Sequence, residues 1–370
     1  MNEFRDAGVV LLMTLLTACA APGDAPEFSR NTLKVLTYNV WHGLNPTGLI
    51  RFSEYETAEE RDTRYRHFLD QVRRLDPDVL LLQETNPAPV FTARLARDLG
   101  YDRVFSLDNG GLRVGSVGLP TNLRSGLAIL ARKDLRMEDR DKRKLSGPPG
   151  FTNRWLCFQL AEFRYGLAAK IHAGNREILI LNTHLHHGIV LSDKLRRVID
   201  GMVEEGVITR DRADEIAAAL AESTARRLTE IDTLMNFADE HGARTTPVIM
   251  GGDFNAEPET QEIQTVLGRY GFTRAMADDP ATGPQPTWDY ERNENTHRIA
   301  DFKFPLEFEP EVDKRLRHYE IGLSRRLDYV FYRDPEKKLT VQSSGLFGTE
   351  EQNGRHASDH FGVFAVFTLD

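Results

Sequence analysis

The chain has 370 residues, of which 40% are hydrophobic and 28% are charged, a composition that is ordinary for a globular protein. Length alone allows two or three domains, although sandwiches and barrels of this size often form one. The net charge of −9 and the pI near 5.7 supply no broad basic surface of the kind that drives tight binding to nucleic-acid phosphates, which weakens a nuclease interpretation without excluding it. A metal ion can still neutralise phosphate charge locally on an acidic protein.

The N-terminus predicts a secretory signal. The apolar run at residues 9–16 is too short to span a bilayer as a folded helix and is typical of the core of a signal peptide. Leu16-Thr-Ala-Cys19 is similar to the bacterial lipobox, which predicts a signal over residues 1–19, a lipid on Cys19 and a tether over residues 20–30. The alternative is a plain signal peptide cut after an alanine near residue 20.

A lipid on Cys19 would place the protein in the cell envelope with the membrane as a partner. Ala20 follows the cysteine in place of the aspartate that signals inner-membrane retention, which favours the outer membrane. The alternative signal predicts a secreted or periplasmic protein. Cys157, the second of two cysteines, lies among apolar residues and is expected to be a buried hydrophobe without a catalytic role.

Residues 31–370 are expected to form one domain of the α/β class, a two-layer β-sandwich flanked by helices. A helical insertion is expected at about 188–225, and residues 132–154 are expected to be a surface loop. Gly201 and Gly206 should divide the long helical segment into at least two helices. Strands are predicted at 33–39, 79–83, 125–131, 156–171, 177–184, 247–253, 329–332 and 361–369, and helices at 59–75, 88–99, 192–240 and 259–270.

Polar side chains occur where several of these short apolar strands begin or end. A strand covered on both faces is a continuous apolar run, and polar groups at its end can converge in one pocket. The residues at these positions are Asn39, Glu84, His184, Asp253, Asn255, Asp328, Asp359 and His360.

These residues supply the chemistry of metal-assisted phosphodiester hydrolysis. The carboxylates and amides are hard oxygen donors without a cysteine or histidine cluster of zinc spacing, which favours Mg²⁺, or else Mn²⁺, over zinc. His184 and His360 can transfer a proton or stabilise charge, and Asp328 can orient one of them.

Each position also has an explanation without catalysis. Residues 251–255 could be only a turn, and Glu84 could cap the helix that follows it. Asp328 could pair with Arg325 or Arg326 on the surface. All of these explanations would have to hold together, which favours a site.

The motifs in this order resemble the endonuclease/exonuclease/phosphatase superfamily over residues 33–369. The resemblance implies the fold of deoxyribonuclease I and a metal-dependent phosphoesterase. It is carried by Thr37-Tyr-Asn-Val40, Gln83-Glu84, Ser125-Gly-Leu-Ala-Ile129, Asn182-Thr-His-Leu185, Gly252-Asp-Phe-Asn255, Arg326-Leu-Asp-Tyr-Val330 and Ser358-Asp-His360.

The resemblance also implies a role for each residue. Glu84 is the principal Mg²⁺ ligand with Asn39 beside it, and Asp359 supports the metal. Asp253 and Asn255 position the attacking water and a phosphate oxygen. His184 donates to the phosphate, and Asp328 orients His360. Whether Asp253 or His360 takes the proton is left open, because the two can titrate together.

Within the superfamily, the chain is most similar to the neutral sphingomyelinase branch, whose members cut lipid headgroups in a phospholipase C reaction. Asn182-Thr-His-Leu-His186, Arg226-Arg-Leu-Thr-Glu-Ile231, Thr287-Trp-Asp289 with Asn295, and Phe304-Pro305 carry this likeness. The chain departs from the secreted bacterial members before the terminal Asp-His, where it has Leu346 and Phe347 in place of an exposed aromatic hairpin.

The sequence therefore predicts a Mg²⁺-dependent phosphodiesterase with a phospholipid as its substrate. The first alternative is a nuclease that acts on DNA or RNA with the same centre. The second is a catalytically inactive binding module held at the membrane, which would be expected to have lost several of these residues.

Overall fold

The structure is a computed structural model that describes residues 31–152, 155–300 and 308–369. The predicted signal, Cys19 and the tether lie outside the described residues, as does Phe304. In the described part of the chain, no helix combines the length and the apolar character needed to cross a membrane.

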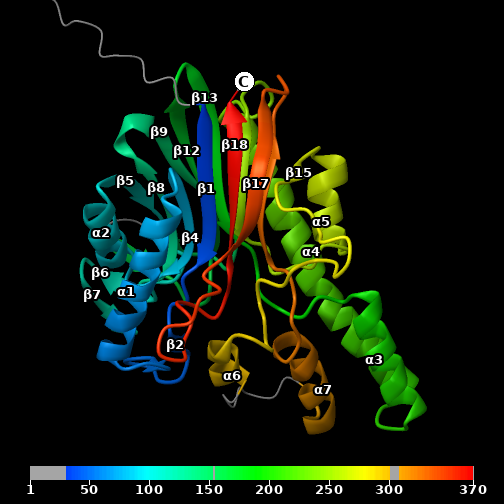
Figure 1. Cartoon of the computed structure of the whole chain (residues 1–370). Coiled ribbons are helices and arrows are strands. Elements are labelled where there is room, and N and C mark those ends of the chain that lie inside the picture. The colour runs from blue at the N-terminus through cyan, green and yellow to red at the C-terminus, as the bar shows by residue number, and fades with distance from the viewer. Residues whose placement is uncertain (1–30, 153–154, 301–307, 370) are drawn as a thin grey trace, which may run out of the picture.

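Two six-stranded mixed sheets pack face to face and form the predicted sandwich (Figure 1). The first has the order β17-β18-β1-β4-β8-β5 and the second β15-β16-β14-β13-β12-β9. The strands of the first sheet are β1 (Thr32–Asn39), β4 (Val79–Thr85), β5 (Tyr101–Phe105), β8 (Gly126–Arg132), β17 (Leu339–Phe347) and β18 (Gly362–Leu369). Those of the second are β9 (Glu138–Ser146), β12 (Arg164–Ala173), β13 (Arg176–His184), β14 (Val248–Asp253), β15 (Thr273–Arg274) and β16 (Asp328–Arg333).

The core between the sheets consists of side chains that the central strands bury on their inner faces. Val35 and Leu81 of the first sheet pack with Ile180 and Ile249 of the second, and all four are fully buried. Burial of this apolar area supplies the main favourable term in folding. It also fixes the two sheets against each other, so their strand ends keep a constant spacing.

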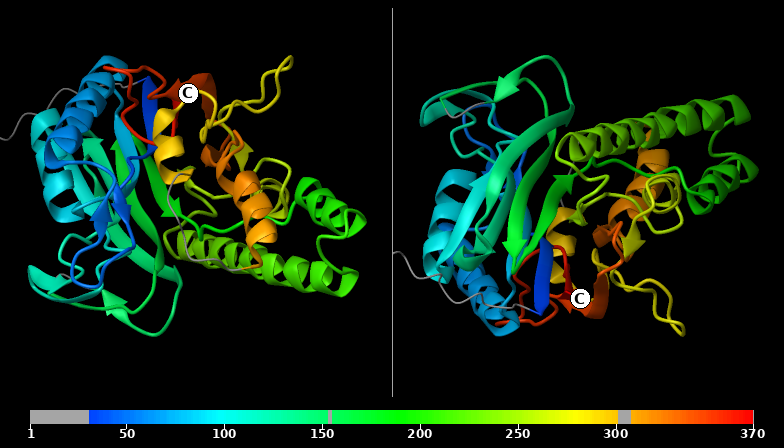
Figure 2. Two further views of the ribbon diagram at one scale, coloured as in Figure 1. Left: turned by 90° about the horizontal axis from the view of Figure 1, so that it is seen from below. Right: turned by 90° about the horizontal axis from the view of Figure 1, so that it is seen from above.

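Helices cover the outer face of each sheet (Figures 1 and 2). α1 (Ala58–Leu75) and α2 (Ala88–Leu99) pack on the first sheet, and α4 (Arg210–Glu240) with α5 (Gln261–Gln264) and the π-helical turn η2 (Thr265–Arg269) packs on the second. α1 begins with a capping box in which Thr57 Oγ1 accepts from Glu60 N and the Glu60 carboxylate accepts from Thr57 N. These bounds agree with the predicted helices at 59–75, 88–99 and 259–270.

The predicted helical insertion contains α3 (Asp193–Glu204) and the first half of α4. Gly206 lies in the turn between them as expected, but Gly201 lies inside α3, so the prediction of a break there was wrong. α3 and α4 pack against a distant segment, α7 (Pro310–Ile321), through Ile199, Ile216 and Leu316. The short helix α6 (Glu294–Ala300) lies beside α7 below the sandwich in Figure 1.

Two predictions between residues 132 and 171 were wrong. The expected loop contains the 3-10 turn η1 (Lys133–Leu135), the edge strand β9 and β10 (Phe151–Thr152), and the expected strand 156–171 is two strands, β11 (Leu156–Phe158) and β12. β11 belongs to a separate four-stranded sheet of order β10-β11-β6-β7, with β6 (Leu112–Val114) and β7 (Val117–Leu119). A two-stranded ribbon of β2 (Leu44–Asn45) and β3 (Ser53–Glu54) completes the strands in the described ranges.

Candidate active site

The polar ends of the central strands meet at one edge of the sandwich. β1 runs parallel to β4 with Asn39 opposite Gln83, and β13 runs parallel to β14 with His184 opposite Asp253. A cleft of about 860 Å³ opens at this edge. Six of the eight predicted residues line it, namely Glu84, His184, Asp253, Asn255, Asp359 and His360.

His360 and Asp328 form a buried hydrogen-bonded pair on the floor of the cleft. His360 Nδ1 donates to Asp328 Oδ2 at 2.8 Å, and both side chains are almost fully buried. Burial alone would lower the pKa of His360, but Asp328 and Asp253 outweigh it and raise that pKa well above its usual value. His360 is therefore held as an imidazolium, and the surface pairing of Asp328 with Arg325 or Arg326 is ruled out.

Asp253 is the acceptor that connects this pair to the rest of the site. Its Oδ2 lies 3.8 Å from His360 Nε2 and 3.5 Å from His184 Nε2. Burial and the nearby Asp328 raise the pKa of Asp253 to about 6, against the opposing effect of His360. At neutral pH this carboxyl is ionised and still basic enough to accept a proton.

Asn255 lies two residues beyond Asp253 on the turn that closes β14. Its backbone N–H donates to Asp253 Oδ1 at 2.9 Å, and its side-chain Nδ2 donates to Leu185 O at 3.1 Å. The residue has a φ of 49°, in the left-handed region that asparagine tolerates. The turn explanation for residues 251–255 is thus correct locally, and the turn also places Asn255 in the cleft.

His184 is a neutral imidazole in this arrangement. Burial lowers its pKa well below the usual value, and the Arg164 guanidinium acts in the same direction. A neutral ring can donate one hydrogen bond without carrying charge. This state is compatible with the predicted contact of His184 with a phosphate oxygen.

Glu84 and Asn39 form the second half of the site. Asn39 Nδ2 donates to Glu84 Oε1 and to Asp253 Oδ2, each at 3.1 Å, and Glu84 Oε2 accepts from the His42 N–H at 3.0 Å. Asn39 lies behind the cleft and faces the carboxylates with its amide nitrogen, so it positions both of them. Its predicted role as a metal ligand stays a prediction.

The backbone at Glu84 turns the side chain into the cleft. Its φ of 57° is left-handed, and α2 begins at a Pro87 cap without a side-chain hydrogen bond, so Glu84 does not cap that helix. Burial would raise the pKa of Glu84, but the His42 side chain and the hydrogen bonds from His42 N and Asn39 hold it at about 2. Glu84 is therefore a carboxylate over the whole working range of pH.

Asp359 lies close enough to Glu84 for the two charges to interact. Burial raises the pKa of Asp359 to about 7, and Glu84 adds to the effect while His360 opposes it. Ser358 Oγ donates to Asn39 O at 2.6 Å, and the same hydroxyl oxygen lies 3.0 Å from Asp359 Oδ1. Two neighbouring acids with oxygen donors alone fit a divalent cation such as Mg²⁺, because its charge would offset their repulsion.

A second group at the floor could also hold a cation. Ligand atoms of Asp253, Asp328 and His360 all lie within 4.8 Å of one another, and all three residues are buried. The hydrogen bond between His360 and Asp328 already uses one ligand atom of each, and the imidazolium would repel a cation. This group is therefore a possible metal site that the charge of His360 disfavours.

Sequence reasoning missed the basic wall of the cleft. Arg164 is buried and lies 2.8 Å from Glu162, with its Nη2 3.2 Å from His187 Nδ1. His42 contacts Glu84 and lies in the loop after β1, and Arg164 begins β12 inside the longer strand that was predicted at 156–171. The pattern of strand ends therefore carried no signal for them.

The motif at residues 287–289 and Asn295 supports the site from behind. Thr287 Oγ1 accepts from the N–H groups of Leu327 and Asp328 at 2.9 and 3.0 Å, and Asn295 Nδ2 donates to Ser358 O at 3.0 Å. The Trp288 ring meets the His360 ring edge-on, with centroids 5.3 Å apart. These contacts hold the two segments that carry Asp328 and His360.

Comparisons with known proteins agree with this geometry. Residues 36–360 match the model of the Endonuclease/Exonuclease/phosphatase family. No curated protein sequence matches the chain significantly.

Solved structures share the fold at low identity. D. rerio TDP2 humanized by 14 mutations matches at 17% identity and a TM-score of 0.52, with 92% of this chain and 100% of that chain covered. D. rerio TDP2 complexed with single strand DNA product matches at 18% and 0.54, with 91% and 99% covered. A mannosyl-6-phosphatase of Bacteroides thetaiotaomicron matches at 17% and 0.54, with 91% and 100% covered.

Proposed function

The chain belongs to the endonuclease/exonuclease/phosphatase family, and we propose from this premise that it is a Mg²⁺-dependent phosphodiesterase that releases headgroups from phospholipids. The observation that carries the proposal is the buried His360 and Asp328 pair, which faces Asp253 across a cleft that also holds Glu84 and Asp359. Proton-transfer groups and an oxygen-donor set thus lie in one cavity. An inactive binding module would not need to keep all of them.

In the proposed reaction, Asp253 accepts the proton of the attacking water. Its pKa of about 6 suits that role at neutral pH, and Asn39 and Asn255 N fix the direction of its oxygens. Mg²⁺ or Mn²⁺ held by Glu84 and Asp359 would polarise the phosphoryl group.

The histidines act on the developing charge. His360, held as an imidazolium by Asp328, stabilises negative charge on the phosphoryl oxygens and can give its Nε2 proton to the leaving oxygen. His184 donates a neutral hydrogen bond to a second oxygen. The proton taken by Asp253 can return to His360 across the 3.8 Å between them, which resets the site.

The cleft wall supports a substrate with an apolar part. Trp41, Phe52, Leu160 and Leu316 line it together with the polar floor. Binding pockets commonly combine apolar walls with a few placed polar groups, and a lipid headgroup ester needs both. We further propose that a lipid on Cys19 holds the enzyme at a membrane of the cell envelope.

Nucleic acid is the second candidate substrate, because a structure of TDP2 that shares the fold was solved with a single strand DNA product. The net charge of −9 argues against it, since phosphate-backbone binding depends on basic residues.

The test is hydrolysis by the purified full-length protein of sphingomyelin, lysophospholipids, DNA, RNA, inositol phosphates and mannose 6-phosphate, each with Mg²⁺ and with a chelator. We expect metal-dependent headgroup release without nicking of DNA. Cleavage of DNA or RNA alone would establish the nuclease alternative, and no metal-dependent hydrolysis of any substrate would overturn the proposal.

A further inference from the structure

The small sheet of β10, β11, β6 and β7 turns an apolar face outward. We call this surface the apolar sheet face, and its side chains are between 44% and 79% exposed. It consists of Leu112, Val114, Val117, Leu119, Phe151, Leu156 and Phe158. In a sheet with one face in water, polar side chains usually point outward and apolar side chains point inward. This sheet has the reverse arrangement.

The inverted pattern is built into the sheet. The side chains that alternate with the exposed ones point inward, and these include Arg113, Thr152 and Cys157, all buried. The Arg113 guanidinium donates to the carbonyl oxygens of Ser116, Pro120 and Leu123 at 2.8, 2.9 and 3.0 Å. Because this polar side chain is satisfied inside, a rotation of the sheet to hide its apolar face would cost those bonds.

Exposed large hydrophobic side chains are concentrated here. The described residues include twelve of them, and seven belong to the apolar sheet face. Four more large hydrophobic side chains are exposed nearby, namely Leu49, Ile50, Trp155 and Leu160. Trp155 and Leu160 flank β11 in the chain, and Ile50 O accepts a hydrogen bond from the Thr121 N–H, which lies just after β7. A contiguous apolar surface of this kind on a globular protein marks an interaction site.

The surface also continues into the cleft. The lining of the cleft includes Gly111, Pro120 and Leu160. Gly111 directly precedes Leu112 of the apolar sheet face, and Pro120 directly follows Leu119. Figure 2 shows the small sheet projecting from the sandwich on the side opposite α3. Whatever binds this face therefore lies at the rim of the active site.

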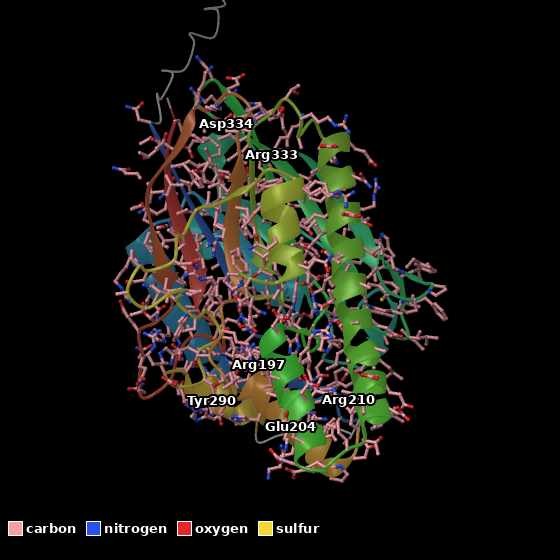
Figure 3. All side chains as sticks on the ribbon, turned by 90° about the vertical axis from the view of Figure 1, so that its right-hand side faces the viewer. Arg197, Glu204, Arg210, Tyr290, Arg333 and Asp334 are labelled. Atoms are coloured by element: carbon pink, nitrogen blue, oxygen red, sulfur yellow. The ribbon has the colours of Figure 1, made fainter. Side chains whose placement is uncertain are left out.

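The chemistry of the face favours a lipid surface over a protein. The outward side chains of its four strands include no charged group, whereas protein interfaces have a polar rim and regular hydrogen bonds. By contrast, Figure 3 shows α3 and α4 covered with charged side chains such as Arg197, Glu204 and Arg210. Aliphatic side chains with a tryptophan beside them suit the boundary between headgroups and acyl chains.

We propose that the apolar sheet face docks on a phospholipid bilayer by inserting its side chains below the headgroups, so that the cleft opens toward the lipid. The docking is a property of this face alone, and its use in presenting headgroups for hydrolysis rests on the proposed function. Because the face is uncharged, binding requires neither anionic lipid nor low salt.

The test is partitioning of the full chain carrying Cys19→Ala, which removes any acyl anchor, into phosphatidylcholine vesicles. The variant Val114→Glu/Val117→Lys places an ion pair at two cross-strand partners of the face. We expect it to lower the partition coefficient by about 10-fold or more, because it removes two apolar contacts and inserts two charges. The control Thr340→Glu/Gln342→Lys introduces the same two charges at exposed polar positions of β17 and should leave partitioning unchanged.

Quenching of tryptophan fluorescence by lipid is a second measurement, and it does not require Val114→Glu/Val117→Lys to fold. Among the three tryptophans, Trp41 and Trp288 are buried and Trp155 is 67% exposed. We expect lipids with brominated acyl chains to quench tryptophan fluorescence, and Trp155→Phe to remove most of that quenching. The rate of hydrolysis of soluble bis(p-nitrophenyl) phosphate should be the same in the Cys19→Ala chain, in Val114→Glu/Val117→Lys and in Trp155→Phe.

The outcomes separate the two proposals. No partitioning of the Cys19→Ala chain would overturn the docking. A homodimer that Val114→Glu/Val117→Lys dissociates, without vesicle binding, would show that the face joins two copies and would overturn it as well. Vesicle binding without headgroup release would support the docking and contradict the proposed lipid substrate.

Discussion

The proton positions in the cleft depend on three neighbouring side chains, Asp253, His360 and Asp328. Asp253 is kept basic by burial, and His360 is kept protonated by the two carboxylates around it. Asp253 can therefore accept a proton, and His360 can donate one. Neither residue would have this state on an exposed surface.

His360→Ala should therefore lower kcat by roughly 100-fold or more, because it removes the charge next to the phosphoryl group and lowers the proton-transfer capacity of the site. Mg²⁺ binding, followed by calorimetry, should change little. His297→Ala is the matched control, since His297 is exposed on α6. Turnover near that of the parent enzyme in His360→Ala would contradict the assigned role.

Asp108 is a buried acid in the cleft wall that should make the stability of the fold depend on pH. Burial raises the pKa of Asp108 to about 7, against the hydrogen bond from Ser106 and the charge of Arg164. The folded protein then holds a proton that the unfolded chain releases at its ordinary pKa of 3.8. Stability from this group is present below pH 3.8 and is lost as the pH rises to 7.

Asp108→Asn cannot ionise, so it should gain stability relative to the parent protein as the pH rises, by up to about 4 kcal/mol at pH 8. Thermal unfolding between pH 4 and pH 8 measures this. Asp214→Asn, at an exposed position of α4, should show no such trend. A constant difference between Asp108→Asn and the parent at all pH values would show that Asp108 is charged in the fold.

The structure brings six of the eight predicted residues into the lining of one cleft, and the positions of all eight share a local signature. Each lies where an apolar strand begins or ends, and parallel or register-matched strands bring such ends together. His42 lies in the loop after β1, and Arg164 begins β12, whose start falls inside the longer strand predicted at 156–171. The loop has no periodic pattern and the predicted strand hid the start of β12, so neither residue could be assigned to the site from the sequence.

At the scale of elements, helices with a clear apolar stripe and buried central strands were predicted well. β9 was missed because its sequence, EDRDKRKLS, is an edge strand with charged side chains and little apolar alternation. The small sheet was missed because its apolar side chains point outward while Arg113 points inward. Pattern reasoning assumes that apolar residues face the core, and here that assumption fails.

The contact of α3 and α4 with α7 forms a module with a core of its own, separate from the sandwich. Ile216→Ala should open a cavity there and cost about 2 to 5 kcal/mol of local stability. Hydrogen exchange should rise in residues 193–216 and 310–321 while the central strands stay protected. Glu215→Ala, at an exposed neighbouring position, should leave exchange in both segments unchanged, and uniform loss of protection in Ile216→Ala would show that the module is not independent.

At the scale of the whole molecule, a bound cation should join two segments that are far apart in the chain, since the proposed ligands are Glu84 of β4 and Asp359, which lies just before β18. Mg²⁺ at 100 times its dissociation constant should stabilise the fold by about 2.7 kcal/mol and raise the melting temperature. Glu84→Gln should remove most of that rise, and Glu259→Gln, at an exposed site, should not. An equal rise in Glu84→Gln would show that the ion binds elsewhere.

The order of the site residues along the chain has a consequence for folding. Asn39 ends β1, while Asp359 and His360 lie just before β18, which inserts between β17 and β1. Ser358 Oγ joins the two segments by donating to Asn39 O. The cleft is therefore complete only when β18 has paired with β1, so its assembly reports the formation of the most distant strand contact of the first sheet.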